Sequence, residues 1–338
     1  MVARRRRAAV MADVGRLAGV SHQTVSRVIN GSPNVRAETR ERVMEAMREL
    51  DYRPNSVARA LVTGHSRTLG VVSFDTTLYG PASTLLGIER AAHEAGYFII
   101  VASLTALTRD SMTEAIERLR VHGVEGILVI APYDDGVHAL VDLPPHVPLV
   151  AVEAGPAQEI PVAVVDQYLG AQMATAHLLE LGHETVWHVG GPADFLEARE
   201  RVRGWREALA QAGAPVHDPL LGDWGAGSGY ALGRRLSDRT DLTALFVAND
   251  QMALGVLRAL HEAGRRVPDD VSVVGFDDVP EAPYFTPPLT TVRQDFDEMG
   301  RRGVRLLLGA IGATEAPAGE GPVVPELIVR ASTAAPRR

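Results

Sequence analysis

Apolar residues recur at helical spacing in three short stretches between residues 11 and 50. The first stretch ends at Gly19, a helix breaker, and Ser21 is a favoured N-cap for a second helix. A third helix is predicted from about Ala37 to Leu50. The predicted inward positions are Met11, Val14, Leu17 and Ala18, then Val25, Val28 and Ile29, then Val43, Ala46, Met47 and Leu50. Two helices joined by a short glycine-containing turn, with a third bracing them, predict a helix-turn-helix headpiece.

From Thr68 the pattern changes to short apolar runs that alternate with helical stretches. The strand-like runs are 69–74, 97–102, 126–130, 149–152, 162–165, 185–189, 244–247 and 271–275. The helical stretches between them are 85–95, 111–120, 170–181, 199–212, 228–236 and 251–263. Repeated strand–helix units predict parallel sheets with right-handed crossovers. So many strands exceed one comfortable sheet, which predicts two doubly wound α/β subdomains.

These patterns divide the chain into four predicted parts: a headpiece (1–54), a hinge segment and linker (55–66), a first core subdomain (67–165 plus 295–332) and a second core subdomain (166–294). The residues Pro287 to Thr291 are interpreted as a crossover rather than as a strand. The chain after Asp295 is therefore expected to return to the first subdomain.

Charge is distributed unevenly along the chain. The net charge of −8 argues against a nucleic-acid partner, but residues 1–62 hold 12 Arg and only 6 acidic residues. A basic head on an acidic body confines favourable phosphate contacts to the head. The run Arg4–Arg7 is expected to add only sequence-independent affinity. The partner predicted for the headpiece is double-stranded DNA.

The second predicted helix carries side chains that can read DNA bases. Gln pairs with adenine, Arg pairs with guanine, and His can donate to a base edge or a phosphate, so His22, Gln23 and Arg27 are the predicted base-reading residues. Short polar side chains suited to phosphate oxygens stand beside them: Ser21, Thr24, Ser26 and Asn30. The alternative interpretation is a small helical packing module with a solvated polar face.

Several other classes of protein lack support in the sequence. No cysteine is present, and the 11 His show no metal-binding spacing. Neither a nucleophile elbow nor a phosphate-binding loop occurs, so no catalytic residue, metal or cofactor is predicted. No apolar run is long enough to span a membrane, and no secretory signal is recognisable. We expect a cytoplasmic protein that acts at the nucleoid and has no membrane partner.

Five motifs together resemble the LacI/GalR family of transcriptional regulators. They are DVGRLAGVSHQTVSRVIN from Asp13, YRPN from Tyr52, VANDQMALG from Val247, VVGFDD from Val273 and PLTTVRQDF from Pro288. The likeness covers roughly residues 9–332. It implies a regulator whose core resembles periplasmic sugar-binding proteins, with an effector held between two subdomains.

The resemblance also implies a hinge helix at about Asn55–Val62 that becomes ordered on the operator. Asn55, Ala58 and Leu61 are its predicted minor-groove residues, with Leu61 as an apolar wedge that kinks the site. An ordinary linker leucine is the alternative. Because no leucine heptads follow residue 332, a homodimer is expected rather than a tetramer.

The resemblance further implies an effector site in the core. The residues that match the family's ligand positions are Leu78, Glu153, Arg201, Trp224, Asn249, Asp277, Gln294 and Phe296. Arg, Asn and Asp can pair with vicinal hydroxyls, and Trp224 offers an apolar face to a sugar ring. The alternative roles are helix N-caps for Asn249 and Asp277, a surface ion pair for Arg201 and a core position for Trp224.

Some positions depart from the family pattern. Glu153 is one methylene longer than the aspartate expected there, and Phe74 and Ile130 are expected to make one side of the pocket more apolar, whereas Leu78, Gly80 and Pro81 match the apolar wall. The prediction is therefore a repressor of sugar-utilisation genes, for a β-galactoside or related glycoside, released by a saccharide inducer. The alternatives are a regulator co-repressed by a purine or another small metabolite and, less favoured, a sugar-binding transport protein.

Overall fold

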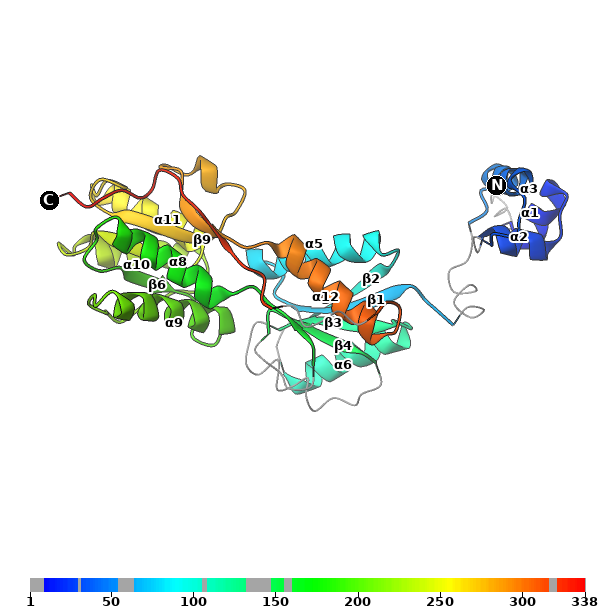
Figure 1. Cartoon of the computed structure of the whole chain (residues 1–338), viewed down its shortest axis with the longest axis horizontal. Helices are drawn as coiled ribbons and strands as arrows, with labels where there is room; N and C mark the ends of the chain where they lie inside the picture. The colour runs from blue at the N-terminus through cyan, green and yellow to red at the C-terminus, as the bar shows by residue number, and fades with distance from the viewer. Residues whose placement is uncertain are drawn as a thin grey trace, which may run out of the picture. The chain divides into compact units, whose positions relative to one another are not determined.

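The computed structural model describes residues 9–29, 32–53, 64–104, 108–131, 147–154, 160–315 and 321–337. The chain forms two compact units, Met1–Ser66 and Arg67–Arg338, here called the headpiece and the core (Figure 1). The run Arg4–Arg7, Asn30 and the predicted hinge residues Asn55, Ala58 and Leu61 lie outside the described residues.

The described part of the headpiece contains α1 (Met11–Ala18), α2 (His22–Ile29) and α3 (Ala37–Glu49). Gly19 ends α1 with a φ of 66°, a left-handed conformation that glycine adopts at little cost. A Cβ on Gly15 would lie 2.8 Å from the carbonyl oxygen of Val20, so the turn packs tightly on α1 only because residue 15 is glycine. The small core between the helices contains Val14, Ala18, Val25, Val28, Val43 and Ala46.

The first core sheet is entirely parallel, with strand order β2-β1-β3-β4-β5. Its strands are β1 (Thr68–Phe74), β2 (Phe98–Leu104), β3 (Gly126–Ile130), β4 (Leu149–Val152) and β5 (Val162–Ala163). Helices α5 (Tyr79–Glu94) and α12 (Phe296–Ala310) cover one face, and α6 (Arg109–Val121) covers the other. Helices on both faces explain why strands such as β3 are continuous apolar runs.

The second core sheet has the order β11-β10-β9-β8-β6-β7. Its strands are β6 (Trp187–Gly190), β7 (Leu220–Leu221), β8 (Ala244–Val247), β9 (Ser272–Asp277), β10 (Thr290–Arg293) and β11 (Glu326–Ile328). The helices are α8 (Gln167–Glu180) and α9 (Leu196–Gln211) on one face, and α10 (Ala226–Ser237) and α11 (Asp250–Glu262) on the other. A short 3₁₀ helix, Ala282–Tyr284, precedes β10.

Two expectations for the last part of the chain differ from the structure. The segment interpreted as a crossover leads into β10, which continues the parallel ladder beside β9. The expected return of residues 295–332 to the first subdomain holds for α12, but β11 pairs antiparallel with β10 in the second sheet. The hydroxyl of Ser332 also donates to the carbonyl of Val273 (2.6 Å). An edge strand completes the backbone hydrogen bonding of β10, which local patterning over three residues does not reveal.

Three connections link the core subdomains: β5 to α8, β10 to α12, and α12 to β11 (Figure 1). Two of them are hydrogen-bonded to each other where they cross, through a parallel bridge between Val165 and Val323. In parallel α/β sheets, ligands bind beyond the carboxyl ends of the strands. Glu153, Gly191, Asn249, Asp277 and Gln294 all stand at or just after such an end, so both sheets direct their functional ends to one cleft.

Candidate nucleic-acid interface and ligand cleft

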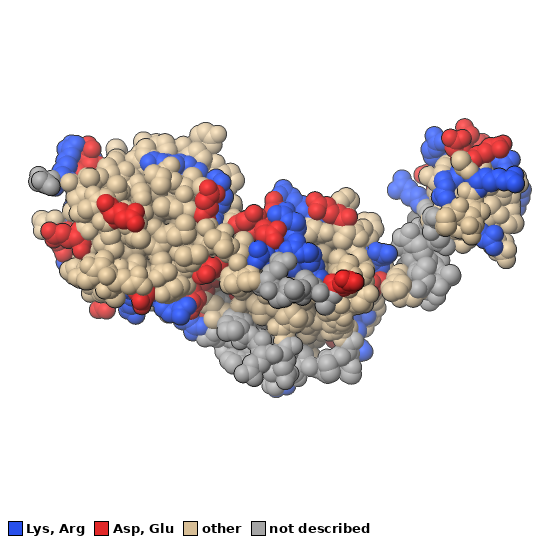
Figure 2. Space-filling view, in the orientation of Figure 1, with Lys and Arg blue, Asp and Glu red and all other residues tan. Residues whose placement is uncertain are grey.

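The exposed face of α2 carries the predicted base-reading residues. His22, Gln23 and Arg27 are exposed, whereas Val25 and Val28 on the opposite face are buried. On the face drawn in Figure 2, arginine covers more of the headpiece surface than acidic side chains do. A helix with an apolar inner face and a polar, basic outer face is what insertion into a major groove requires.

The N-terminus of α2 shows how the phosphate candidates are arranged. The hydroxyl oxygen of Ser21 accepts a hydrogen bond from the backbone N–H of Thr24 (3.2 Å) and lies 3.1 Å from the Thr24 hydroxyl. Ser21 therefore caps the helix. Ser21 is exposed, while Thr24 and Ser26 are half-buried. The helix cap and a phosphate contact are compatible, since a hydroxyl has one donor and two acceptor sites.

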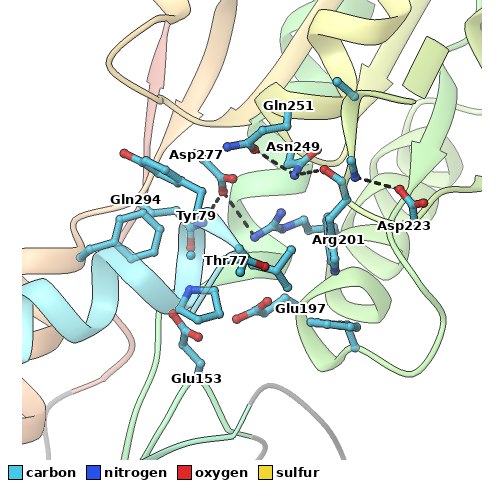
Figure 3. A pocket seen from close by; sticks show the side chains of 18 of the residues that line it. Thr77, Tyr79, Glu153, Glu197, Arg201, Asp223, Asn249, Gln251, Asp277 and Gln294 are labelled. Carbon is cyan, nitrogen blue, oxygen red and sulfur yellow. Dashed lines mark hydrogen bonds and ion pairs between the residues drawn. The ribbon is translucent and has the colours of Figure 1, made fainter. Parts of the chain in front are cut away.

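A cavity of about 380 Å³ lies between the two core subdomains. It is lined by Thr77–Pro81, Glu153, Phe195, Glu197, Arg201, Asp223–Ala226, Asn249, Gln251, Leu254, Asp277, Gln294 and Phe296 (Figure 3). All eight predicted effector residues are among them. Phe74 and Ile130, expected to make the pocket more apolar, are absent from this lining, and Ile130 instead packs in the core of the first subdomain.

Four buried side chains on the second-subdomain side form a closed polar ring. Arg201 Nε donates to Gln167 Oε1 (2.9 Å), and Gln167 Nε2 donates to Gln294 Oε1 (2.7 Å). Gln294 Nε2 then donates to Asp277 Oδ1 (2.7 Å), which lies 3.8 Å from Arg201 Nη2. Arg201 also donates to the carbonyl of Ala248 (2.5 Å). The ring fixes residues from α8, α9, β9 and the end of β10 relative to one another. A surface ion pair is therefore the wrong description of Arg201.

Asn249 and Trp224 hold each other in place. Asn249 Oδ1 accepts from the backbone N–H of Met252 (2.9 Å), so the residue is indeed the N-cap of α11. Its Nδ2 donates to the carbonyl of Trp224 and to Gln251 Oε1, both at 3.0 Å. The Asn249 side chain thus joins the cap of α11 to the loop that carries Trp224 (Figure 3).

The indole of Trp224 is both a core residue and part of the cavity wall, since it is 7% exposed. Phe195 meets its ring edge-on at a centroid distance of 5.5 Å, and the guanidinium carbon of Arg201 lies 5.4 Å from the ring centroid. A Cβ on Gly191 would approach the indole to 2.3 Å, so glycine is needed there. The indole N–H is buried without a hydrogen-bond partner among the described residues.

The first-subdomain side of the cavity is more apolar. Leu78, Tyr79 and Phe296 line it, and the rings of Tyr79 and Phe296 meet edge-on at 5.8 Å. The acid on this side is Glu153, 6% exposed, which accepts a hydrogen bond from the Thr84 hydroxyl. An apolar wall facing a few fixed polar groups is the usual composition of a small-molecule site.

Three cavity residues other than glycine have positive φ: Glu153 at 60°, Trp224 at 70° and Asp277 at 110°. Such conformations are unfavourable for side chains with a Cβ, and they persist where the surrounding structure holds them. Their shared position on the cavity wall indicates that packing and hydrogen bonds hold these side chains in place for binding.

The acidic groups of the cleft have raised pKa values. Burial raises the pKa of Glu153 to about 7, against the opposing effects of the Thr84 hydrogen bond and Arg201. Burial likewise raises the pKa of Asp277 to about 6, opposed by Arg201 and Gln294. The pKa of Glu197 is raised well above its usual value by loss of hydration and by the neighbouring Glu153. The cleft therefore holds several carboxyl groups that resist ionisation.

Sequence reasoning missed several residues of this site, above all Phe195 and Glu197 in the cavity wall and Gln167 in the polar ring. Glu197 stands four residues before Arg201 on α9, and that spacing puts both on one helix face. The spacing could have identified it. Gln167 reaches the ring from α8 through a tertiary contact, for which the sequence carries no local signal.

Two other features, a metal site and a membrane-spanning helix, are absent from the described residues. Within them, no cluster of three or more histidine and acidic side chains is arranged to hold a metal ion. No helix in the described ranges is long and apolar enough to cross a bilayer.

Comparison with known proteins identifies the class. The model of bacterial regulatory proteins of the lacI family matches residues 10–55, and the periplasmic binding protein-like domain matches residues 175–333. The lactose operon repressor of Escherichia coli (strain K12) is 35% identical over 326 residues, which cover 96% of this chain and 90% of that protein. The chain belongs to the lacI family of bacterial regulatory proteins. It is a DNA-binding transcriptional regulator with a small-molecule effector, and it is not an enzyme.

Individual relatives show how far the likeness extends. CelR of Thermobifida fusca is 37% identical over 325 residues, covering 93% of this chain and 95% of that protein. PurR of Mannheimia succiniciproducens is 32% identical over 329 residues, 96% and 98% of the two chains. The lac repressor dimer bound to operator and the anti-inducer ONPF superposes with a TM-score of 0.86 at 33% identity, over 97% of this chain and all of that one. The helix-turn-helix headpiece and the two-sheet core predicted from the sequence are confirmed.

Proposed function

We propose that the protein is a homodimeric repressor of sugar-utilisation genes, acting in the cytoplasm and released from its operator by a saccharide inducer. The observation that carries this proposal is the composition of the cleft. An indole that lines the cavity stands beside a ring of fixed amide, carboxyl and guanidinium groups. A sugar ring has the matching chemistry, since its C–H face is apolar and its hydroxyls both donate and accept.

The relatives support a saccharide without fixing which one. They include the lactose and ribose operon repressors of Escherichia coli, 35% and 34% identical, and a CelR–cellobiose complex with a TM-score of 0.67 at 35% identity, covering 96% of this chain. The PurR relatives, 32% identical in the case of Mannheimia succiniciproducens, favour a second candidate, a regulator co-repressed by a purine.

Allostery would connect the cleft to the headpiece. A ligand changes an equilibrium only by the difference in its affinity for the two states. We infer that the inducer favours an arrangement of the subdomains in which the hinge segments of the two protomers no longer pair on DNA. His22, Gln23 and Arg27 would read bases, Ser21, Thr24, Ser26 and Asn30 would contact phosphates, and Asn55, Ala58 and Leu61 would enter the minor groove.

Fluorescence titration of the full chain tests the choice of effector. Cellobiose, lactose, ribose, hypoxanthine and guanine are added separately, and tryptophan emission is recorded. A saturable response to a sugar that disappears in Trp224→Phe supports the saccharide, because Trp187 and Trp205 do not line the cavity. A response to a purine alone would replace it with the second candidate.

Operator selection from random duplexes then gives the sign of regulation. The selected duplex is bound with and without the responding compound, and the hinge prediction is tested with Leu61→Ala. Weaker binding in the presence of the sugar is expected. Tighter binding would contradict induction.

A further inference from the structure

Two carboxyl side chains line the cavity from opposite subdomains. Glu153 follows β4 of the first sheet, and Glu197 lies in the first turn of α9 beside the second sheet. Both also line an adjoining hollow of about 380 Å³, so they stand at the boundary between the two spaces. In Figure 3 their carboxyl groups are neighbours at the lower edge of the cavity. Their mutual electrostatic effect agrees with that proximity.

Positive charge in this cavity is scarce and already engaged. Among the described lining residues, Arg201 is the single arginine, against Glu153, Glu197, Asp223 and Asp277. The Arg201 guanidinium donates to Gln167 and Ala248, and its carbon lies 3.9 Å above the Phe276 ring. An anionic ligand would therefore find several acids and no uncommitted cation on the described part of the wall.

The paired carboxyls offer the opposite chemistry, which is acceptance of hydrogen bonds. Glu153 Oε1 is occupied by the Thr84 hydroxyl, while its buried Oε2 has no hydrogen-bond partner among the described residues. A buried polar oxygen without a partner is costly, and a donor supplied by a ligand removes that cost.

We propose that Glu153 and Glu197 form a paired-carboxyl subsite that takes hydrogen-bond donors of an uncharged effector from both subdomains and rejects anionic effectors such as phosphorylated sugars. The effector class rests on the proposed function, whereas the proximity of the two acids does not. Glu197 is thereby a specificity-determining residue. By bonding to both acids, one ligand would also link the two subdomains.

Burial is the main cause of the raised pKa values of the two acids. Other ionisable groups face the pair from the elements packed around it. They are Arg201 and Asp277 in the cavity, and Asp166, Tyr168, Glu200 and Arg203 around the adjoining hollow. A carboxyl whose pKa is raised by folding stabilises the folded chain while protonated, below about pH 4.5, and that stability is lost as the pH rises through the folded-state pKa, about 7 for Glu153. Replacing one acid of the pair should make the loss of stability with rising pH smaller.

The first experiment needs no ligand. Melting temperatures of the full chain are recorded from about pH 5 to about pH 8 for the wild type, Glu153→Gln, Glu197→Gln and the control Glu207→Gln. Glu207 lies on the same helix but outside this cavity. We expect the melting temperature of the wild type and of Glu207→Gln to fall with rising pH, and that of the two cleft variants to fall less. Identical profiles for all four proteins would show that the two acids are not perturbed by burial and by each other, and would overturn the paired subsite.

The second experiment measures selectivity. Calorimetry first identifies which of cellobiose, lactose and ribose binds most tightly. The dissociation constant of that sugar is then compared with that of its phosphate ester, which is cellobiose 6-phosphate, lactose 6-phosphate or ribose 5-phosphate. The wild type and Glu207→Gln should bind the ester at least about tenfold more weakly, since like charges in a desolvated site repel strongly. Glu197→Gln should bring the ratio of the two dissociation constants, ester to free sugar, closer to one.

An unchanged ratio in Glu197→Gln, or tight binding of the ester by the wild type, would overturn the selectivity. If none of the three sugars bound, the proposed function would fail, and the carboxyl pair would be judged by the ligand-free pH profiles alone. The two failures are therefore distinguishable.

Discussion

In the headpiece the polar side chains of α2 point into solvent, whereas in the core the polar side chains of the cleft are buried and bonded to one another. His22, Gln23 and Arg27 stand on a helix whose opposite face makes the packing contacts. Arg201 and Asp277 are each 6% exposed or less at the side chain and belong to a closed ring. With the recognition roles proposed for these residues, the headpiece keeps recognition apart from stability, and the cleft combines them.

This difference has an energetic reason. A polar side chain in solvent carries no penalty for unsatisfied hydrogen bonds in the absence of DNA, because water bonds to it. A buried polar group must be satisfied within the protein before the ligand arrives, and the ring of Arg201, Gln167, Gln294 and Asp277 does so. Substitutions at the exposed positions of α2 should therefore affect binding alone, and substitutions in the ring should affect folding as well as binding.

The largest expected effect is that of Arg201→Ala. It leaves the buried Asp277 carboxyl without its cation and Gln167 without a donor, so we expect the free energy of unfolding of the core to fall by about 3 kcal/mol. Urea unfolding followed by circular dichroism measures the change. Arg239→Ala is the matched control, because the Arg239–Asp241 pair lies at the surface of the same subdomain with side chains 45% and 51% exposed. That control should change stability by less than about 1 kcal/mol.

A double variant separates charge from packing. In Arg201→Ala/Asp277→Asn the buried carboxyl is replaced by a neutral amide, so part of the lost stability should return. An unfolding free energy no higher than that of Arg201→Ala alone would mean that the loss came from the cavity left by the guanidinium, and that the ring contributes no electrostatic stabilisation.

The contrast between these regions also explains what the sequence could predict. The headpiece helices depend on local signals, namely the apolar stripes, Gly19 and the Ser21 cap, and they were placed closely. The alternation of strands and helices likewise predicted two parallel sheets. The edge strand β11 and the ring member Gln167 could not be placed, because each depends on contacts between segments distant in sequence. The positive φ of Trp224 is similarly a product of the assembled loop.

The next effect concerns the headpiece, where Arg27→Ala should weaken binding to the selected operator about tenfold, or about 1.4 kcal/mol, by removing one base contact. Its effect on melting should be negligible, because Arg27 is exposed. Fluorescence anisotropy with selected and scrambled duplexes measures the ratio. Arg48→Ala, an exposed arginine near the end of α3, serves as the control for charge. Equal losses on both duplexes would assign Arg27 to the phosphate backbone.

The smallest expected effect separates the two roles of Ser21, which caps α2 and is also a proposed phosphate contact. Ser21→Ala removes the acceptor for the Thr24 backbone N–H and should lower headpiece stability by about 1 kcal/mol, measured as faster hydrogen exchange of the α2 amides. Ser21→Asp keeps a capping oxygen and should preserve that protection. Its added negative charge should nevertheless weaken operator binding if the side chain faces a phosphate. Full operator affinity in Ser21→Asp would leave Ser21 a helix cap only, and the separation of recognition from stability in the headpiece would then be complete.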